Sequence, residues 1–227
     1  MNLGFTVDDD EQSVRINRNR LFSTLGCRPS DVVVMQQVHG AECRLVSSME
    51  RSLGALEQRS ALAGVDALTT REQRLVLMGL FADCVPVCIF DPVSNALALC
   101  HASWRGTARR VAPAAVRCLV ESGSKVNDLT AVIGPCICQR CYEVGDDVVD
   151  ALGLYDMSMP GVLVPSRPGK WLLDLRTLNS AQLADSGVPM HNISVYDMCT
   201  ACNEDLFFSH RRDGAKTGRM AMVCWIE

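Results

Sequence analysis

The sequence predicts an α+β fold, arranged as a single compact domain over residues 1–227 with mixed β-sheets flanked by helices. Three observations support this prediction. The 227 residues are within the usual range of one domain. No repeat, low-complexity segment or linker rich in proline and glycine divides the chain. Strand-like segments follow one another in adjacent runs more than they alternate with helices, which favours α+β over a doubly wound sheet.

Seven apolar segments are expected to form strands because they are short, rich in β-branched or aliphatic residues and bounded by turn residues. His39-Gly40 is the turn candidate after the first of them, and Asp91 to Asn95 is the turn candidate after the third. The expected strands span residues 32–38, 75–81, 85–90, 96–100, 129–133, 193–196 and 219–225.

Two segments have the periodicity of amphipathic helices. After Arg109, apolar residues recur at i, i+3, i+4, i+7 and i+8 from Val111, and Gly123 ends the pattern. Pro113 is tolerated only in the first turn of a helix, so this helix should begin shortly before it. A second helix is expected from about Leu175 to Ala184, closed by Gly187.

Composition excludes several classes of protein. Apolar residues make up 48% and charged residues 21%, as in globular proteins. The net charge of -4, from 22 basic and 26 acidic residues, argues against a nucleic-acid-binding protein. No apolar run reaches the roughly 18 residues of a membrane span, and the first 20 residues hold no signal-peptide core. We therefore expect a cytoplasmic protein that binds neither nucleic acid nor a membrane.

The chain has twelve cysteines and four histidines. Since it shows no export signal, reduced thiols that serve as core residues, metal ligands or nucleophiles are a better interpretation than disulfides. His39, Cys84 and His101 each lie at or near the end of an expected strand, where sites are commonly built. Two imidazoles and a thiolate form a plausible zinc set with a fourth position open for catalysis. Alternatively, they are a turn histidine, a small buried hydrophobe and a strand-end histidine bonded to a carbonyl.

A second group of cysteines forms two CxxC pairs about sixty residues apart, within the segments 136–141 and 199–202. Cys138 and Cys141 with Cys199 and Cys202 could make a Cys₄ structural zinc site. The alternative is that these residues, together with Cys136, are reduced cysteines in turns.

Several arginines are candidates for anion binding. Arg211 and Arg212 begin a dense polar stretch that continues through Arg219, and a guanidinium offers a bidentate fork to phosphate or carboxylate. An ordinary solvated hairpin is the alternative for this stretch. Arg105, beside Trp104 and Gly106, is a further candidate. The chain has no P-loop and no GxGxxG fingerprint.

Taken together, these motifs resemble the laccase-domain family, also called multicopper polyphenol oxidoreductases and now regarded as zinc-dependent purine nucleoside phosphorylases. The resemblance covers nearly the whole chain in family order. It rests on Asn2-Leu3-Gly4, QQVHG at 36–40, ADC at 82–84, HASWRGT at 101–107, IGPCI at 133–137, CYEVG at 141–145, DLRTLN at 174–179, CTAC at 199–202, FFSHRRDG at 207–214 and TGRMA at 217–221.

The resemblance implies a zinc site of His39, Cys84 and His101. It also implies phosphorolysis of adenosine, inosine and methylthioadenosine, with purine nucleosides and phosphate as partners, and an additional adenosine deaminase activity. The family's older name implies copper, but four histidines cannot furnish the ligands of four coppers. In this interpretation Arg105 is an anion clamp, Arg211 and Arg212 contribute to substrate binding, and Asp83 carries a proton or orients a ligand.

Other functions stay open at this point. The family is also grouped with a bacterial deamidating toxin, which suggests a metal-free cysteine hydrolase with Cys84 as nucleophile and His101 as base. A third hypothesis is a non-enzymatic zinc or redox scaffold built on the CxxC pairs. The sequence departs from the family in having Ser103 where glycine is usual. It also begins at a point where family members commonly carry an upstream glycine-rich strand and loop, so that segment is expected to be absent.

Overall fold

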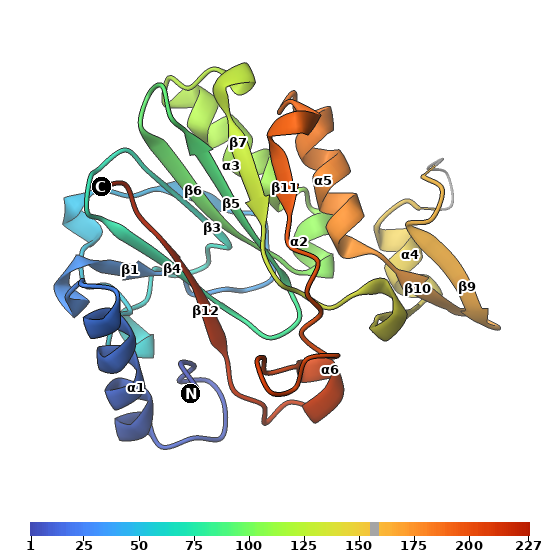
Figure 1. Cartoon of the computed structure of the whole chain (residues 1–227), viewed down its shortest axis with the longest axis horizontal. Helices are drawn as coiled ribbons and strands as arrows, with labels where there is room; N and C mark the ends of the chain where they lie inside the picture. The colour runs from blue at the N-terminus through green and yellow to red at the C-terminus, as the bar shows by residue number, and fades with distance from the viewer. Residues whose placement is uncertain (155–158) are drawn as a thin grey trace.

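The computed structural model describes residues 1–154 and 159–227. Its main body has four layers, which Figure 1 shows from one side. A group of helices covers one face of a six-stranded sheet, a three-stranded sheet packs against the other face, and helix α1 (Glu11–Thr24) covers the outer side of the smaller sheet. Helices and mixed sheets that pack around shared cores confirm the predicted α+β class.

The six-stranded sheet has the order β11-β7-β5-β6-β3-β2 and is mixed. Its centre is the antiparallel pair β5 and β6, and parallel pairs lie at both edges. The turn between β5 and β6 is held by Asp91, whose Oδ1 accepts from the backbone N–H groups of Val93 and Ser94 at 2.9 and 3.1 Å. The strands are β2 (Cys43–Leu45), β3 (Ala67–Thr70), β5 (Val85–Asp91), β6 (Ala96–Ala102), β7 (Thr130–Ile133) and β11 (Ile193–Val195).

One face of this sheet packs against helices α2 (Trp104–Ala108), α3 (Val111–Glu121) and α5 (Leu175–Asp185). Successive side chains of a strand point to opposite faces, so alternate residues of β5 enter this core. Leu119 of α3 is fully buried within it. Replacing Leu119 by alanine should cost about 2–5 kcal/mol, because the surrounding side chains can collapse only partly into the cavity.

The smaller sheet has the order β1-β4-β12 and consists of β1 (Val32–Val34), β4 (Val76–Phe81) and β12 (Met220–Cys224). Strand β1 pairs with β4 in parallel, whereas β12 pairs with β4 in the antiparallel sense. Leu77 packs toward the six-stranded sheet, and its neighbour Met78 packs toward α1. Both faces of β4 are therefore buried.

Helix α1 is absent from the sequence prediction, and its buried face explains why. Val14, Arg18 and Phe22 point inward at i, i+4 and i+8, so the middle position of the inner face is a cation. The Arg18 Nε donates to the Leu3 carbonyl at 2.8 Å and Nη1 donates to the Ala55 carbonyl at 3.0 Å. Apolar periodicity cannot reveal a helix whose central inward residue is a cation that donates hydrogen bonds to backbone carbonyls of other segments.

A third, smaller sheet projects from the main body beside α5 (Figure 1). It has the antiparallel order β8-β10-β9 and is followed in the chain by α5. Its strands are β8 (Glu143–Gly145), β9 (Leu163–Arg167) and β10 (Lys170–Leu173), with α4 (Asp146–Ala151) between the first two. Within the described residues, no helix is long and apolar enough to cross a membrane.

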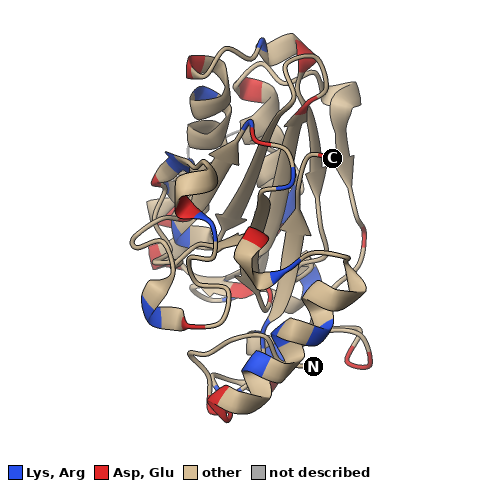
Figure 2. Ribbon diagram, turned by 90° about the vertical axis from the view of Figure 1, so that its left-hand side faces the viewer, with Lys and Arg blue, Asp and Glu red and all other residues tan. Residues whose placement is uncertain are grey.

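The structure confirms six of the seven expected strands to within two residues at each end, and both expected helices. Pro113 is the third residue of α3, within its first turn. The strand expected over 32–38 is too long, because regular pairing ends at Val34. The stretch around Arg211 is not a hairpin, since it forms the short helix α6 (His210–Asp213) before β12. In Figure 2, charged residues lie mostly on the helices and loops, whereas the central strands carry few of them.

Candidate active site

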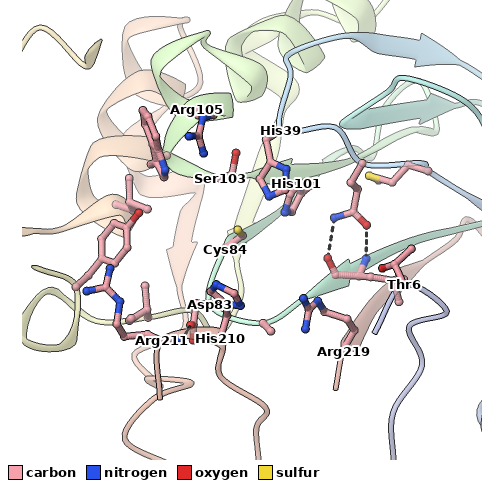
Figure 3. A pocket seen from close by; sticks show the side chains of 18 of the residues that line it. Thr6, His39, Asp83, Cys84, His101, Ser103, Arg105, His210, Arg211 and Arg219 are labelled. Atoms are coloured by element: carbon pink, nitrogen blue, oxygen red, sulfur yellow. Dashed lines mark hydrogen bonds between the residues drawn. The ribbon is translucent and has the colours of Figure 1, made fainter. Parts of the chain in front are cut away.

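Three strand ends meet at one place in the fold and bring His39, Cys84 and His101 together (Figure 3). Because β1 and β4 are parallel, the segments that follow them, which carry His39 and Cys84, leave the sheet at the same edge. Cys84 precedes β5, and the antiparallel register of β5 with β6 pairs Pro86 with His101. One nitrogen or sulfur atom of each of the three side chains lies within 4.8 Å of the others.

The buried carboxylate of Asp66 holds two of these residues in place. Its Oδ1 is 2.8 Å from Nδ1 of His101, so Nε2 is the ring nitrogen that Asp66 leaves available to Cys84 or a metal. The same carboxylate accepts from the backbone N–H groups of Val38, His39 and Gly40 at 3.1, 3.1 and 2.6 Å. It thereby stabilises a loop in which His39 adopts a φ of 59°, in the left-handed region. A carboxylate that orients a metal-binding histidine is a common feature of metal sites.

The three titratable groups at this point change one another's protonation. Burial alone would raise the pKa of the Cys84 thiol, but the charge of His101 and hydrogen bonds from both histidines lower it to about 6. Burial alone would lower the pKa of His101, but the Cys84 thiolate and the Asp66 carboxylate raise it to about 9. For Asp66, hydrogen bonds from His101 and the backbone outweigh burial and keep the pKa below its ordinary value. The Cys84 sulfur is therefore a thiolate at neutral pH, ready to bind a metal or to act as a nucleophile.

Asp83 precedes Cys84 and fixes the loop that presents it. Its φ of 91° is unusual for a residue with a side chain, and such strain must be stabilised by the surroundings. Oδ1 accepts from the Thr200 hydroxyl at 2.6 Å, and Oδ2 accepts from the backbone N–H of Arg211 at 2.7 Å. The Asp83 carbonyl accepts from the N–H of Ile137 at 3.0 Å. With both carboxylate oxygens engaged, this geometry favours the orienting role over proton transfer.

A cavity of about 540 Å³, a volume typical of small-molecule sites, is lined by His39, Asp83, Cys84 and His101. Aromatic rings and guanidinium groups form much of its wall. The Arg105 guanidinium lies 4.2 Å from the centre of the Trp104 ring, and that of Arg211 lies 5.1 Å from the centre of the Tyr142 ring. The half-buried Arg219 lines the cavity as well, so three cations face the same space.

Arg211 and Arg212 have different environments although they are adjacent in α6. Arg211 lines the cavity and donates from Nη1 to the Glu143 carbonyl at 2.8 Å. Arg212 is not among the lining residues. Its guanidinium pairs with Asp213 and donates to the carbonyls of Thr200, Ala201 and Phe207. The structure therefore places Arg211 where it can meet a substrate and Arg212 where it supports the loops behind the cavity.

Ser103, the residue found in place of the family's usual glycine, has a clear structural role. Its side chain is buried and accepts from the backbone N–H of Gly106 at 3.0 Å. It is the N-cap of α2, the helix that carries Arg105. The substitution therefore stabilises the start of this helix and leaves His39, Cys84 and His101 in place.

Sequence reasoning missed several residues of the site. Asp66 carries the clearest signal, a single carboxylate within the apolar run Val65 to Leu68. Gln37 pairs its side-chain amide with the backbone N–H and C=O of Leu80 at 2.8 and 2.7 Å (Figure 3), which joins the loop before His39 to β4. Thr6 and Gln58 also line the cavity and belong to no motif of the sequence. Tyr142, Leu175, His210 and Arg219 line it as well, and they lie within the family motifs, although the sequence alone assigned them no individual role.

A second group of potential ligands lies outside this cavity. The sulfur atoms of Cys138, Cys141, Cys199 and Cys202 all lie within 4.8 Å of one another. All twelve cysteines of the chain are among the described residues and are free thiols. The structure thus brings together both groups of metal-capable residues that the sequence indicated.

Comparison with known proteins agrees with the resemblance found in the sequence. The family model described as multi-copper polyphenol oxidoreductase laccase matches residues 1–227. The chain belongs to this family. It is 41% identical over 225 residues to "Purine nucleoside phosphorylase YlmD" from Geobacillus stearothermophilus, a match that covers 97% of this chain and 81% of the relative. It is also 39% identical over 220 residues to "Adenosine deaminase RL5" from an unknown prokaryotic organism, covering 96% and 84%.

A solved member of the laccase-like family has the same fold. The crystal structure of YlmD from Geobacillus stearothermophilus matches with a TM-score of 0.95 at 39% sequence identity. The match covers 100% of this chain and 85% of that one. The fold described here is therefore the fold of the family.

Proposed function

We propose that this protein is a zinc-dependent purine nucleoside phosphorylase that acts on adenosine, inosine and methylthioadenosine and that also deaminates adenosine. One observation carries the proposal: His39, Cys84 and His101 converge in a cavity whose walls hold aromatic rings and three arginines. A nucleoside needs apolar surfaces for its base, and phosphate needs cations. The names of the two relatives, a phosphorylase and a deaminase, support the same pair of activities.

The donor set fits a zinc ion. Catalytic zinc sites commonly have three protein ligands and one position open to water or substrate, and a carboxylate such as Asp66 often orients a ligating histidine. Zinc bound by one thiolate and two neutral imidazoles keeps a net charge of +1, and it supplies a Lewis acid that attracts an anion. The same donors can hold a single copper ion. Oxidation by several coppers would need more ligands than the chain's four histidines provide.

In phosphorolysis, a phosphate oxygen forms a bond to the ribose C1′ while the bond from C1′ to the purine nitrogen breaks. Positive charge develops on the sugar, and the leaving purine takes the electron pair and then a proton. We assign Arg105 to the binding of phosphate, because it lies near the three ligands on a helix start capped by Ser103. Arg211 and Tyr142 form the opposite part of the wall and are assigned to the nucleoside.

In deamination, water replaces phosphate as the nucleophile and attacks the purine C6, and the exocyclic nitrogen leaves as ammonia. The two reactions need the base in different positions, with C1′ near the ligands in one and C6 near them in the other. The cavity of about 540 Å³ is within the usual range of small-molecule sites, and both reactions are assigned to it.

The decisive experiment combines His39→Ala with a panel of nucleosides assayed with and without phosphate, with products separated by chromatography. The wild-type protein should release the free base only with phosphate and convert adenosine to inosine without it. His39→Ala should lose the zinc of this site and reduce both turnovers by about 10³-fold or more, since metal catalysis contributes several kcal/mol.

His191→Ala is the matched control, because His191 is exposed and lies outside the cavity. It should keep both the metal and the activity. Full activity of metal-stripped His39→Ala protein would refute the proposal. An intense thiolate-to-copper charge-transfer band in the absorption spectrum of the purified protein would show that the metal is copper.

A cysteine hydrolase is the second candidate function, and a specific observation favours it. Cys84, His101 and Asp66 have the order of nucleophile, base and orienting carboxylate that thiol hydrolases use. In that mechanism the Cys84 sulfur would attack an acyl carbon and His101 would protonate the leaving group. A substrate adduct trapped on Cys84 during turnover would favour this function, whereas turnover of adenosine and inosine that is lost when zinc is removed would favour the zinc enzyme.

A further inference from the structure

The four-cysteine group (Cys138, Cys141, Cys199 and Cys202) has the dimensions of a tetrahedral thiolate site. Zinc–sulfur bonds are about 2.3 Å long, so the sulfur atoms of a tetrahedral site are about 3.8 Å apart. Here all four Sγ atoms lie within 4.8 Å of one another, and those of Cys141 and Cys202 are 3.4 Å apart. These separations are close to the zinc geometry and too long for a sulfur–sulfur bond of about 2.05 Å.

The two CxxC segments that supply the ligands are already joined by backbone contacts. Cys136 and Cys199 form an isolated parallel bridge, with the N–H of Thr200 donating to the Cys136 carbonyl at 3.1 Å. The backbone N–H of Cys138 donates to Sγ of Cys199 at 3.2 Å. An N–H group aimed at a sulfur stabilises the thiolate form, which is the form that binds metal. Contacts within the protein therefore hold the two cysteine segments against each other.

The side chains around such a site carry charges of both signs. Four thiolates and one divalent cation carry a net charge of -2, which needs nearby positive charge when it is partly buried. Arg140 and Arg176 line the hollow beside the four cysteines. Asp174 and Asp197 line it too, and Asp197 pairs with Arg176 at 2.6 Å. The guanidinium of Arg212 donates to the carbonyls of Thr200 and Ala201, inside the second CxxC segment.

We propose that Cys138, Cys141, Cys199 and Cys202 bind a second zinc ion, in a closed site that is separate from the candidate active site. All four positions of a tetrahedral ion are filled by protein sulfur, so the site has no position for a substrate and its role is structural. This inference goes beyond the proposed function, because it concerns other residues and another ion.

The position of the site explains what the ion would stabilise. Ile137 and Thr200 lie inside the two cysteine segments, and both donate hydrogen bonds to Asp83, whose strained backbone presents Cys84. Tyr142, which lines the cavity, directly follows Cys141. An ion that joins the two segments would fix the position of the Cys84 loop relative to one wall of the cavity.

The test is the metal content of the whole protein, purified under reducing conditions and dialysed against zinc-free buffer. The wild type should hold about two zinc ions per chain. The double variant Cys141→Ala/Cys202→Ala, which changes the two least buried ligands, should hold about one, because two thiolates cannot retain the ion. Cys27→Ala/Cys118→Ala is the matched control, since both are half-buried thiols outside either group, and it should keep both ions.

Cobalt substitution gives a second readout that does not depend on activity. The intensity of thiolate-to-cobalt charge transfer rises with the number of sulfur ligands, so the wild type should absorb several-fold more strongly than the double variant. The single variant Cys202→His should still bind the second zinc ion, unlike the double variant, because an imidazole also binds zinc.

Two results would overturn the inference. One is equal metal content in the wild type and the double variant. The other is a Cys141–Cys202 disulfide in the reduced, anaerobically purified wild type, seen as the loss of two hydrogens in that peptide pair. Neither result bears on the proposed function, because that function fails only if the ion assigned to His39, Cys84 and His101 is absent or dispensable.

Discussion

The two metal-capable groups of this chain differ in what surrounds them. His39, Cys84 and His101 supply three donors beside a cavity of about 540 Å³, and one of the donors is oriented by a buried carboxylate. The four-cysteine group supplies four donors from two facing segments, beside backbone contacts that already join those segments. An incomplete donor set that faces a cavity suits catalysis, whereas a complete one suits structural support.

The comparison also shows how the two groups are connected. Asp83 lies between them and accepts hydrogen bonds from Thr200 on the cysteine side and from the backbone of Arg211 on the cavity side. A change in the four-cysteine group therefore reaches Cys84 through Asp83, while a change at Asp66 reaches His101 directly.

Among variants outside the three donor residues, the largest effect is expected from Asp66→Asn, which should weaken zinc binding at the three-residue group by about 10–100-fold. An amide cannot match the carboxylate, because it accepts fewer hydrogen bonds and carries no charge to favour the oriented imidazole of His101. Competition with a chromogenic chelator would measure the affinity.

Asp91→Asn is the matched control for this change. Asp91 is equally buried and also accepts from backbone N–H groups, but it holds the turn between β5 and β6. The Asp91→Asn variant should have a lower thermal stability and an unchanged zinc affinity. If both variants weakened zinc binding equally, Asp66 would have only a structural role.

A smaller effect, of about tenfold, is expected in the alkylation of Cys84 by iodoacetamide. In the zinc-loaded protein the thiolate is committed to the metal and should react slowly, and chelation should accelerate labelling. Because the pKa of Cys84 is about 6 rather than the ordinary 9, the stripped protein should keep its fast reaction at pH 7 and lose it only as the pH falls through about 6.

The labelling must be followed peptide by peptide by mass spectrometry, since the other cysteines react as well. Cys27 serves as the internal reference, because it lies outside both groups and its labelling should not respond to chelation. Fast labelling of Cys84 with zinc fully retained would contradict its role as a ligand.

The sequence predicted the central strands well because their apolar runs and turns are local signals. It missed α1, whose inward face contains Arg18. It also missed the edge strand β2 and its neighbour β3, which form by pairing with each other and, for β3, with β6. These elements depend on partners far away in the chain, which no local window of sequence contains.

The residues of the candidate site fall into the same two classes, those that local sequence marks and those whose role depends on distant partners. His39, Cys84 and His101 could be named from residue type and position at strand ends, and the structure brings them together. Asp66 stands out in the sequence as a carboxylate within an apolar run, but its role could not be predicted, because that role depends on the antiparallel register that places β3 beside β6. Arg211 and Arg212 look equivalent in sequence, and only helix α6 separates their directions.

The smallest effects, and the most unequal ones, are expected when Arg211 and Arg212 are each replaced by glutamine. Arg211→Gln removes a cation from the cavity wall and should weaken the apparent phosphate or nucleoside affinity by about tenfold, as expected for one charge-assisted hydrogen bond. Arg212→Gln should leave affinity nearly unchanged but lower the free energy of unfolding by about 1–3 kcal/mol, because three carbonyls lose their donor. Steady-state kinetics and thermal unfolding of both variants would measure the contrast.

Since Arg212 supports the second CxxC segment, its variant should also release the zinc of the four-cysteine group more readily, whereas Arg211→Gln should not. Equal effects of the two variants on affinity would mean that α6 contributes to the cavity only as a whole.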